Sequence, residues 1–189
     1  MATTEDDFLL DEVWTLYFHD PKDAAWTTQS YVRVVDVSSA ADHAAICHAL
    51  RGRVPHGMFF LMREQVFPCW DDKRNINGGC VSVRVPKRDA EAYWTELCAR
   101  VLCEELEAKD NTDEEDKPLV NGVSISPQPF CSVVKVWRGQ RASACASSEE
   151  AVCSLLALPP GYVGSPIYRP NREVIGASQA RALQGQGGG

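Results

Sequence analysis

Six short segments rich in β-branched and aromatic residues constrain the fold of this 189-residue chain more than any other feature. Each has the length and composition of a β-strand, and they cover residues 12–18, 30–37, 57–63, 79–85, 120–126 and 131–137. Only three helical patterns lie among them, at about 38–50, 89–106 and 148–156. Strands in hairpin-length succession with few helices favour an α+β fold, an antiparallel sheet with its helices on one face. The other face is then left for a ligand.

Three stretches carry the signals of helices. A serine at 38 or 39 is placed to cap the first of them, which runs to about residue 50. Asp89 precedes the second, and its apolar residues at 90, 93, 94, 97, 101 and 102 fall on one helical stripe, as in a helix that lies on a sheet. The third, over 148–156, follows a Ser-x-x-Glu spacing typical of a capping box.

Composition and charge fit one globular domain. The expected organisation is a flexible acidic arm over 1–11, a single domain over 12–176 and a disordered tail over 177–189.

The formal charge of −7 speaks against a broad nucleic-acid surface, although it leaves recognition of a chain end open. No apolar run reaches the ~18–20 residues of a membrane span. The acidic start lacks the features of a signal peptide, so the expected location is cytoplasmic, with a nuclear location also open.

The eight cysteines and four histidines give no sign of a metal site or of catalysis. No two cysteines form a C-x-x-C pair, and none has a zinc-like spacing with the histidines. No glycine-rich phosphate loop follows a strand, and no histidine belongs to a nucleophile motif. We therefore expect reduced thiols, no metal, no cofactor and no enzymatic activity.

The five tryptophans are the residues most open to a binding role. Taken singly, a tryptophan belongs more often to a hydrophobic core than to a ligand site. Trp14 and Trp94 lie within apolar-patterned elements and are expected in the core, whereas Trp26 and Trp70 lie in polar, turn-like stretches. Trp137 ends a predicted strand, and both interpretations stay open for it.

The segment over residues 67–79 reads FPCWDDKRNINGG. It resembles the P-x-W-E-D-x-x-N-x-x-G-G segment of the cap-binding translation initiation factor 4E family. Further matches follow in the family's order over residues 12–168, about four-fifths of the chain: VWTLYF at 13–18, AW at 25–26, W-x(9)-E at 94–104, glycine and tryptophan at 122 and 137, and LPP at 158–160. As a set these matches are highly specific.

The resemblance implies a strongly curved antiparallel β-sheet with about three long helices on its convex face and a slot for the mRNA cap on its concave face. Carried over residue by residue, Trp26 and Trp70 would sandwich the 7-methylguanine base. Asp71 would bind the guanine edge, and Trp137 would contact the N7-methyl group. The implied function is the binding of capped mRNA in translation initiation.

These residue types suit a methylated guanine. N7-methylation makes the base a cation, and each indole face gains ~0.5–2 kcal/mol from a stacked cation. Stacking contributes ~1–3 kcal/mol per base, and a carboxylate accepts from the two donors of the guanine edge in charge-assisted bonds worth ~1.5–3 kcal/mol. Together these terms support micromolar binding, which needs ~8 kcal/mol net. Unmethylated guanine lacks the charge and loses much of this preference.

The chain departs from the family pattern around the cap. Asp71 replaces the family's usual glutamate and is shorter by one methylene group. Positions at which the family carries basic residues are uncharged here, namely Cys80, Gln128, Phe130 and Val133. Side chains 133, 135 and 137 share one face of a strand by the two-residue period. Lys135 is therefore a candidate to take over the phosphates, and Arg138 is a second candidate because it follows Trp137 directly in the sequence. A solvated surface role for both is the alternative.

The helical face departs as well. The family presents a tryptophan early in its first helix, which holds the helical motif of scaffold and inhibitor proteins. The nearest residue here is His43, so such a partner is expected to make atypical contacts around it. This divergence resembles the atypical family members of trypanosomatid protozoa, whose cap is methylated over several nucleotides. Tyr162, Tyr168 and Arg169 are then candidates to contact the additional nucleotides, and ordinary loop residues are the alternative.

Three functions stay open at this point. The leading hypothesis is a cap-binding translation initiation factor. The second is a cap-binding repressor of translation that does not engage the usual scaffold. The third is a protein-interaction module whose cap slot has decayed, which the uncharged phosphate positions motivate.

Overall fold

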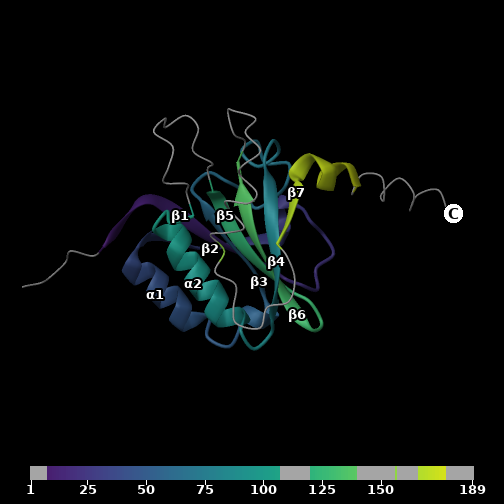
Figure 1. Ribbon diagram of the computed structural model, residues 1–189. Helices are drawn as coiled ribbons and strands as arrows, with labels where there is room; N and C mark the ends of the chain where they lie inside the picture. Colours follow the sequence, from purple (N-terminus) through teal and green to yellow (C-terminus); the bar gives the residue numbers. More distant parts are fainter. Residues whose placement is uncertain (1–7, 107–119, 140–155, 157–165, 178–189) are drawn as a thin grey trace, which may run out of the picture.

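The computed structural model describes residues 8–106, 120–139, 156 and 166–177. Within this part of the chain, seven strands form one curved antiparallel sheet in the order β2-β1-β3-β5-β6-β4-β7 (Figure 1). The strands are β1 (Leu9–His19), β2 (Tyr31–Ser39), β3 (Met58–Arg63), β4 (Gly79–Pro86), β5 (Val120–Pro127), β6 (Cys131–Arg138) and β7 (Ile167–Pro170). The predicted α+β fold is confirmed.

Two helices, α1 (Ala40–Ala49) and α2 (Ala90–Leu102), lie side by side on one face of this sheet (Figure 1). Short 3₁₀ turns occur at Thr28–Ser30 and Val54–His56, and residues 171–177 are helical as well. Neither α1 nor α2 combines the length and apolar character that a membrane span requires.

Alternation along the strands creates two different faces, because successive side chains point to opposite sides of a sheet. In β3, Phe59 and Leu61 join the main core beneath the helices, whereas Phe60 and Met62 join a smaller apolar cluster on the other face. The predicted stripe of α2 is buried against the main core, with Ala90, Tyr93, Trp94, Leu97, Cys98, Val101 and Leu102. One face is therefore covered by helices and the other is open to a ligand.

The start of α1 follows the predicted cap. The Ser39 hydroxyl accepts a hydrogen bond from the Asp42 backbone N–H at 3.1 Å. The Asp42 carboxylate accepts one from the Ser38 backbone N–H at 2.9 Å. This bond, followed by those from the serine side chains, lowers the pKa of Asp42. α2 ends earlier than predicted, at Leu102, and Glu104 has a left-handed φ of 55°.

The two ends of the chain differ from the prediction. β1 begins at Leu9, which pairs with Ser39 of β2, so residues 9–11 belong to the sheet and not to a flexible arm. β7 and the helical residues 171–177 have no counterpart in the predicted elements. The predicted helix over 148–156 falls almost entirely outside the described residues, and so does the predicted tail beyond residue 177.

Close packing explains two of the glycines in the matched segments. Gly122 and Trp137 are direct partners in the β5–β6 pair, which accounts for their fixed separation along the chain. A Cβ on Gly122 would lie 2.4 Å from the Met62 sulfur. A Cβ on Gly79 would lie 2.5 Å from the ring of Tyr168 on β7. Both positions exclude a side chain because neighbouring strands occupy the space.

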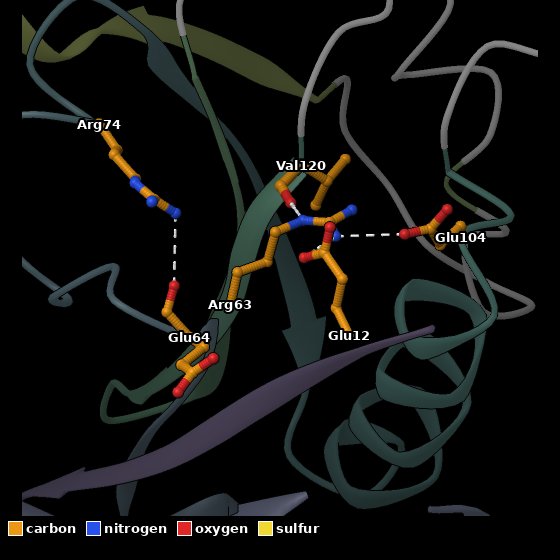
Figure 2. A network of polar contacts seen from close by, with 6 residues as sticks. All are labelled: Glu12, Arg63, Glu64, Arg74, Glu104 and Val120. Carbon is orange, nitrogen blue, oxygen red and sulfur yellow. Dashed lines mark hydrogen bonds and ion pairs between the residues drawn. The ribbon is translucent and has the colours of Figure 1, made fainter. Parts of the chain in front are cut away.

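One buried arginine connects β1, β3, β5 and the end of α2 (Figure 2). Arg63 is 5% exposed, and its Nε donates to the carbonyl oxygen of Val120 at 2.7 Å. Its Nη1 donates to the carboxylates of Glu12 at 2.6 Å and Glu104 at 3.2 Å. The guanidinium carbon also lies 4.8 Å from the ring centre of Trp14. A planar fork of five donors lets one side chain serve all these partners.

Candidate functional site

A cavity of about 510 Å³ opens on the sheet face opposite α1 and α2. Strands β3, β5 and β6 form its floor, and the β1–β2 loop, the β3–β4 loop and the helical residues 171–177 form its rim. This volume falls within the ~300–1,000 Å³ usual for small-molecule sites. The lining residues are Trp26, Tyr31, Met58, Phe60, Pro68, Cys69, Trp70, Asp71, Ser126, Gln128, Val133, Lys135, Trp137 and Ile175.

Strand β6 runs through the centre of the floor. Val133, Lys135 and Trp137 line the cavity, while the residues between them face the main core, as the two-residue period predicts. Trp137 is 2% exposed, and its Nε1 donates to the Ser124 hydroxyl on β5 at 2.9 Å. The indole of Trp137 is thus fixed in the floor of the cavity.

Trp26 lies on the β1–β2 loop and is 54% exposed. One face of its indole stacks on the imidazole of His19, with ring centres 4.2 Å and planes 8° apart. Tyr31 meets it edge-on at 6.2 Å. His19 is fully buried, and its Nε2 lies 3.0 Å from the carbonyl oxygen of Ala25, so Nε2 carries the proton. His19 supports one face of Trp26 and leaves the other for a ligand. Sequence reasoning missed this role, because no local pattern marks it.

We expect His19→Ala to weaken the binding of a methylated cap analogue by about threefold to tenfold, because Trp26 loses its stacked support. His19→Phe keeps a flat ring under Trp26 and is expected to retain most of the binding. Calorimetric titration measures both affinities, and thermal unfolding checks that both variants fold. An alanine variant that is folded and binds as tightly as the wild type would contradict the supporting role.

The β3–β4 loop that carries Trp70 is shaped by the side chains of its own motif. The carboxylate of Asp72 accepts a hydrogen bond from the Phe67 backbone N–H at 3.3 Å. Asn75 is fully buried, and its Nδ2 donates to the carbonyl oxygens of Phe67 at 3.0 Å and Cys69 at 2.9 Å. The Asp and Asn of the motif therefore build the loop that brings Trp70 to the cavity.

The same asparagine connects the loop to the C-terminal part of the chain. Asn171, also fully buried, donates from Nδ2 to the carbonyl oxygen of Asn75 at 2.7 Å. Asn121 on β5 donates to the side-chain oxygen of Asn75 at 2.9 Å. This network fixes the start of the helical residues 171–177, which contribute Ile175 to the cavity wall.

Asp71 follows Trp70 and lines the cavity. Burial, and then the hydrogen bond with Asp71, raises the pKa of Cys69 to about 12, so the thiol stays protonated near neutral pH and donates to the carboxylate. Burial is also the main cause that raises the pKa of Tyr31, and the charge of Asp71 adds to it. Cys69 and Tyr31 are therefore both uncharged beside the Asp71 carboxylate, which keeps its capacity to accept hydrogen bonds from a ligand.

Lys135 is the cationic side chain that lines the cavity in the described part of the chain. Its Nζ lies 5.4 Å from the centre of the Trp70 ring. Arg138 is 4% exposed, and the alternation of β6 directs it away from the cavity. This position argues against the predicted phosphate contact of Arg138 and leaves Lys135 as the candidate.

The three residues predicted to contact additional nucleotides do not lie together at the cavity in the part of the chain that the structure describes. Tyr162 lies outside the described residues. Tyr168 packs against the main core on the helix side, so its ring points away from the cavity and the predicted stacking is not supported. Arg169 is exposed and lies opposite Cys80 in the β4–β7 strand pair. Cys80 belongs to the apolar cluster on the cavity side of the sheet. Paired residues share a face, which places Arg169 on the cavity side of the sheet.

The positions at which the family carries basic residues remain uncharged around the cavity. Gln128 and Val133 line it, and Phe130 is 93% exposed at the β5–β6 turn. Cys80 is buried, with its sulfur 3.4 Å from the side-chain oxygen of Asn171. Burial raises the pKa of Cys80 to about 12, so it carries no charge near neutral pH. None of these four side chains can neutralise a phosphate group.

The outer face of α1 carries no large anchor. His43 is half-buried, its Nε2 lies 3.4 Å from the Cys47 sulfur, and burial lowers its pKa. It lines a small cavity between α1, α2 and the sheet and does not protrude. The exposed residues of α1 are Ala40, Ala41, Ala44, Ala45, His48 and Ala49.

Comparison with known proteins agrees with the fold and the motif. Eukaryotic translation initiation factor NCBP from Arabidopsis thaliana is 26% identical over 138 residues, 68% of this chain and 55% of that protein, so the chain spans about half the length of this curated relative. The C. elegans eIF4E-3 structure, a complex with the 4E-binding protein Mextli and a cap analog, superposes with a TM-score of 0.71 at 17% identity and covers 90% of this chain and 96% of that one.

Ascaris suum eIF4E-3 in complex with an m2,2,7G cap gives a TM-score of 0.66 at 19% identity, over 87% of this chain and 99% of the other. At such identities the structural likeness shows the fold alone. The model of the family Eukaryotic initiation factor 4E matches residues 9–181, most of the sequence. This chain therefore belongs to the eukaryotic initiation factor 4E family.

Proposed function

We propose that this chain binds the 7-methylguanosine cap of mRNA between Trp26 and Trp70 and acts in translation initiation in the cytoplasm. The observation that carries the proposal is that both indoles line one cavity, with Asp71 beside Trp70 and Trp137 in the floor. Relatives of the same fold from C. elegans and Ascaris suum have been solved with a cap analog and with an m2,2,7G cap. The proposed activity is binding, without a catalytic step.

Each proposed contact matches a property of the ligand. The free face of Trp26 and the face of Trp70 toward the cavity would stack on a cationic purine, which gains ~0.5–2 kcal/mol per ring. The Asp71 carboxylate would accept from N1–H and N2–H of the guanine edge. Trp137 is fixed by Ser124 at the floor, where it would meet the N7-methyl group. Lys135 is the proposed phosphate contact among the lining residues.

Two substitutions test the aromatic sandwich. Trp26→Ala and Trp70→Ala are each expected to weaken 7-methyl-GTP binding at least about tenfold, or about 1.4 kcal/mol. Calorimetric titration with 7-methyl-GTP and GTP is the measurement, because removal of an indole would itself alter a fluorescence signal. Phe8→Ala removes an aromatic ring that is 84% exposed and does not line the cavity, and it serves as the control.

The wild type is expected to bind 7-methyl-GTP more tightly than GTP. Equal affinity for the two nucleotides would contradict the cation-based mechanism. No binding of either by the wild type would overturn the proposal and favour a protein-interaction module with a decayed slot.

We also propose that a scaffold or inhibitor protein binds the helical face. The C. elegans relative was solved with Mextli, and a schistosome relative with 4E-BP. On this chain a partner would meet the alanine-rich outer face of α1, near the half-buried His43. Small side chains allow close approach of a helix but offer no aromatic anchor.

That surface favours a second candidate, a cap-binding protein that represses translation because it does not engage the usual scaffold. The two candidates share the cavity and differ in what accompanies the protein on capped mRNA. Purification on a cap-analogue resin from cytosolic extract separates them. Co-purification of a large scaffold and a helicase would support the initiation factor, and their absence would support the repressor.

A further inference from the structure

Lys135 places a cation on the ring that is proposed to stack on the cap base. Its Nζ lies 5.4 Å from the centre of the Trp70 ring, within the ~6 Å over which an aromatic face attracts a cation. Lys135 extends from the floor of the cavity, between Val133 and Trp137, which both line it. Because Lys135 and Trp70 both line the cavity, the ammonium group approaches the Trp70 ring from the cavity side.

Few other groups among the described residues are placed to bind the ammonium group of Lys135. Among the described residues, no carboxylate forms an ion pair with Lys135. Burial lowers the pKa of Lys135, and the charge of Arg169 adds to this shift. A partly desolvated ammonium gains more from an indole face than a fully hydrated one does. Within the part of the chain that the structure describes, the Trp70 ring is therefore the group placed to attract the ammonium of Lys135.

A stacked base and the lysine compete for the same ring face. The 7-methylguanine base carries its own positive charge, so it would repel an ammonium group at stacking distance. A methylated base that stacks on this face of Trp70 would therefore require Lys135 to move away. The flexible four-carbon stem of lysine permits this movement, and the phosphates attached to the base provide an anionic partner for the displaced group.

We propose that Lys135 makes the cavity select phosphate-bearing caps over the methylated base alone. In the free protein its ammonium group occupies the Trp70 face, and on binding it moves from the ring to the phosphates. Displacement of the lysine disfavours every methylated ligand, whereas only a phosphorylated ligand gives the displaced charge a new partner. The inference rests on the proposed function, since it requires Trp70 to stack on a methylated base.

Lys135→Met tests the inference with two ligands, 7-methylguanosine and 7-methyl-GTP. Methionine keeps a long unbranched side chain and removes the charge. The variant is expected to bind the nucleoside about threefold more tightly, because the competing cation is gone. It is expected to bind the triphosphate about tenfold more weakly, because the phosphate contact is lost. Opposite signs for the two ligands distinguish this role from a purely structural one.

The matched control is Lys73→Met, since Lys73 is exposed on the same loop as Trp70 and does not line the cavity. It is expected to leave both affinities within about twofold of the wild type. Calorimetry gives the affinities, and thermal unfolding confirms that both variants fold. Weaker binding of both ligands by Lys135→Met, or no change in either, would overturn the selection by Lys135 and leave cap binding standing. A wild type that binds neither ligand would instead overturn the proposed function.

Discussion

Asp71→Asn is expected to weaken 7-methyl-GTP binding by about tenfold to a hundredfold without unfolding the protein. The guanine edge presents two adjacent donors, and a carboxylate accepts from both. An asparagine offers one acceptor and sets its amide donors against a donor of the base. The loss of negative charge also removes attraction to the cationic ring. The loop that carries Asp71 is held by hydrogen bonds of Asp72 and Asn75, so we expect the variant to fold.

Two further variants separate the effect of the negative charge of Asp71 from the effect of its side-chain length. Asp71→Glu restores the longer carboxylate of the family pattern and is expected to bind within about threefold of the wild type. Glu64→Gln removes one exposed negative charge at the start of the same loop, outside the cavity, and should leave the affinity unchanged. Calorimetric titration is again the measurement. An Asp71→Asn variant that keeps full affinity would show that this carboxylate does not bind the guanine edge.

The resemblance of residues 67–79 to the family motif points to the candidate site because that motif is local. Trp70 and Asp71 lie within one loop, and the Asp72 and Asn75 side chains that shape this loop belong to the same short segment. The two-residue period of β6 likewise predicts that Lys135 shares a face with Trp137, and both residues line the cavity. Local hydrogen bonding and strand alternation depend on neighbouring residues, so both are accessible to sequence reasoning.

The features that sequence reasoning missed depend on contacts between distant segments. The support of Trp26 by His19 requires the β1–β2 loop to fold back on the last residue of β1. The pairing of β7 with β4 joins residues about ninety positions apart, which no local pattern encodes. The prediction for Arg138 loses its support for a different reason. The same two-residue period that places Lys135 at the cavity directs Arg138 away from it. Strand alternation therefore predicts the direction of the Arg138 side chain better than its adjacency to Trp137 does.

Arg63→Ala is expected to lower the free energy of unfolding by about 2–4 kcal/mol. The buried guanidinium donates to Val120, Glu12 and Glu104 (Figure 2) and covers the ring of Trp14. Alanine leaves the Val120 carbonyl oxygen without this donor and opens a cavity beside the indole. The two carboxylates are 53% and 41% exposed, so water can rehydrate them, and the loss stays below that of a fully buried ion pair.

Graded substitutions show which property of Arg63 matters. Arg63→Met keeps the apolar stem over Trp14 and should recover part of the lost stability, while Arg63→Lys keeps the charge but cannot serve three acceptors in one plane. Arg33→Ala breaks an exposed pair with Asp36 and should cost less than about 1 kcal/mol. Urea unfolding measures all four variants, and equal slopes justify the comparison. Because Arg63 connects β1, β3, β5 and the end of α2, a loss in Arg63→Ala no larger than that in Arg33→Ala would show that these elements hold together without it.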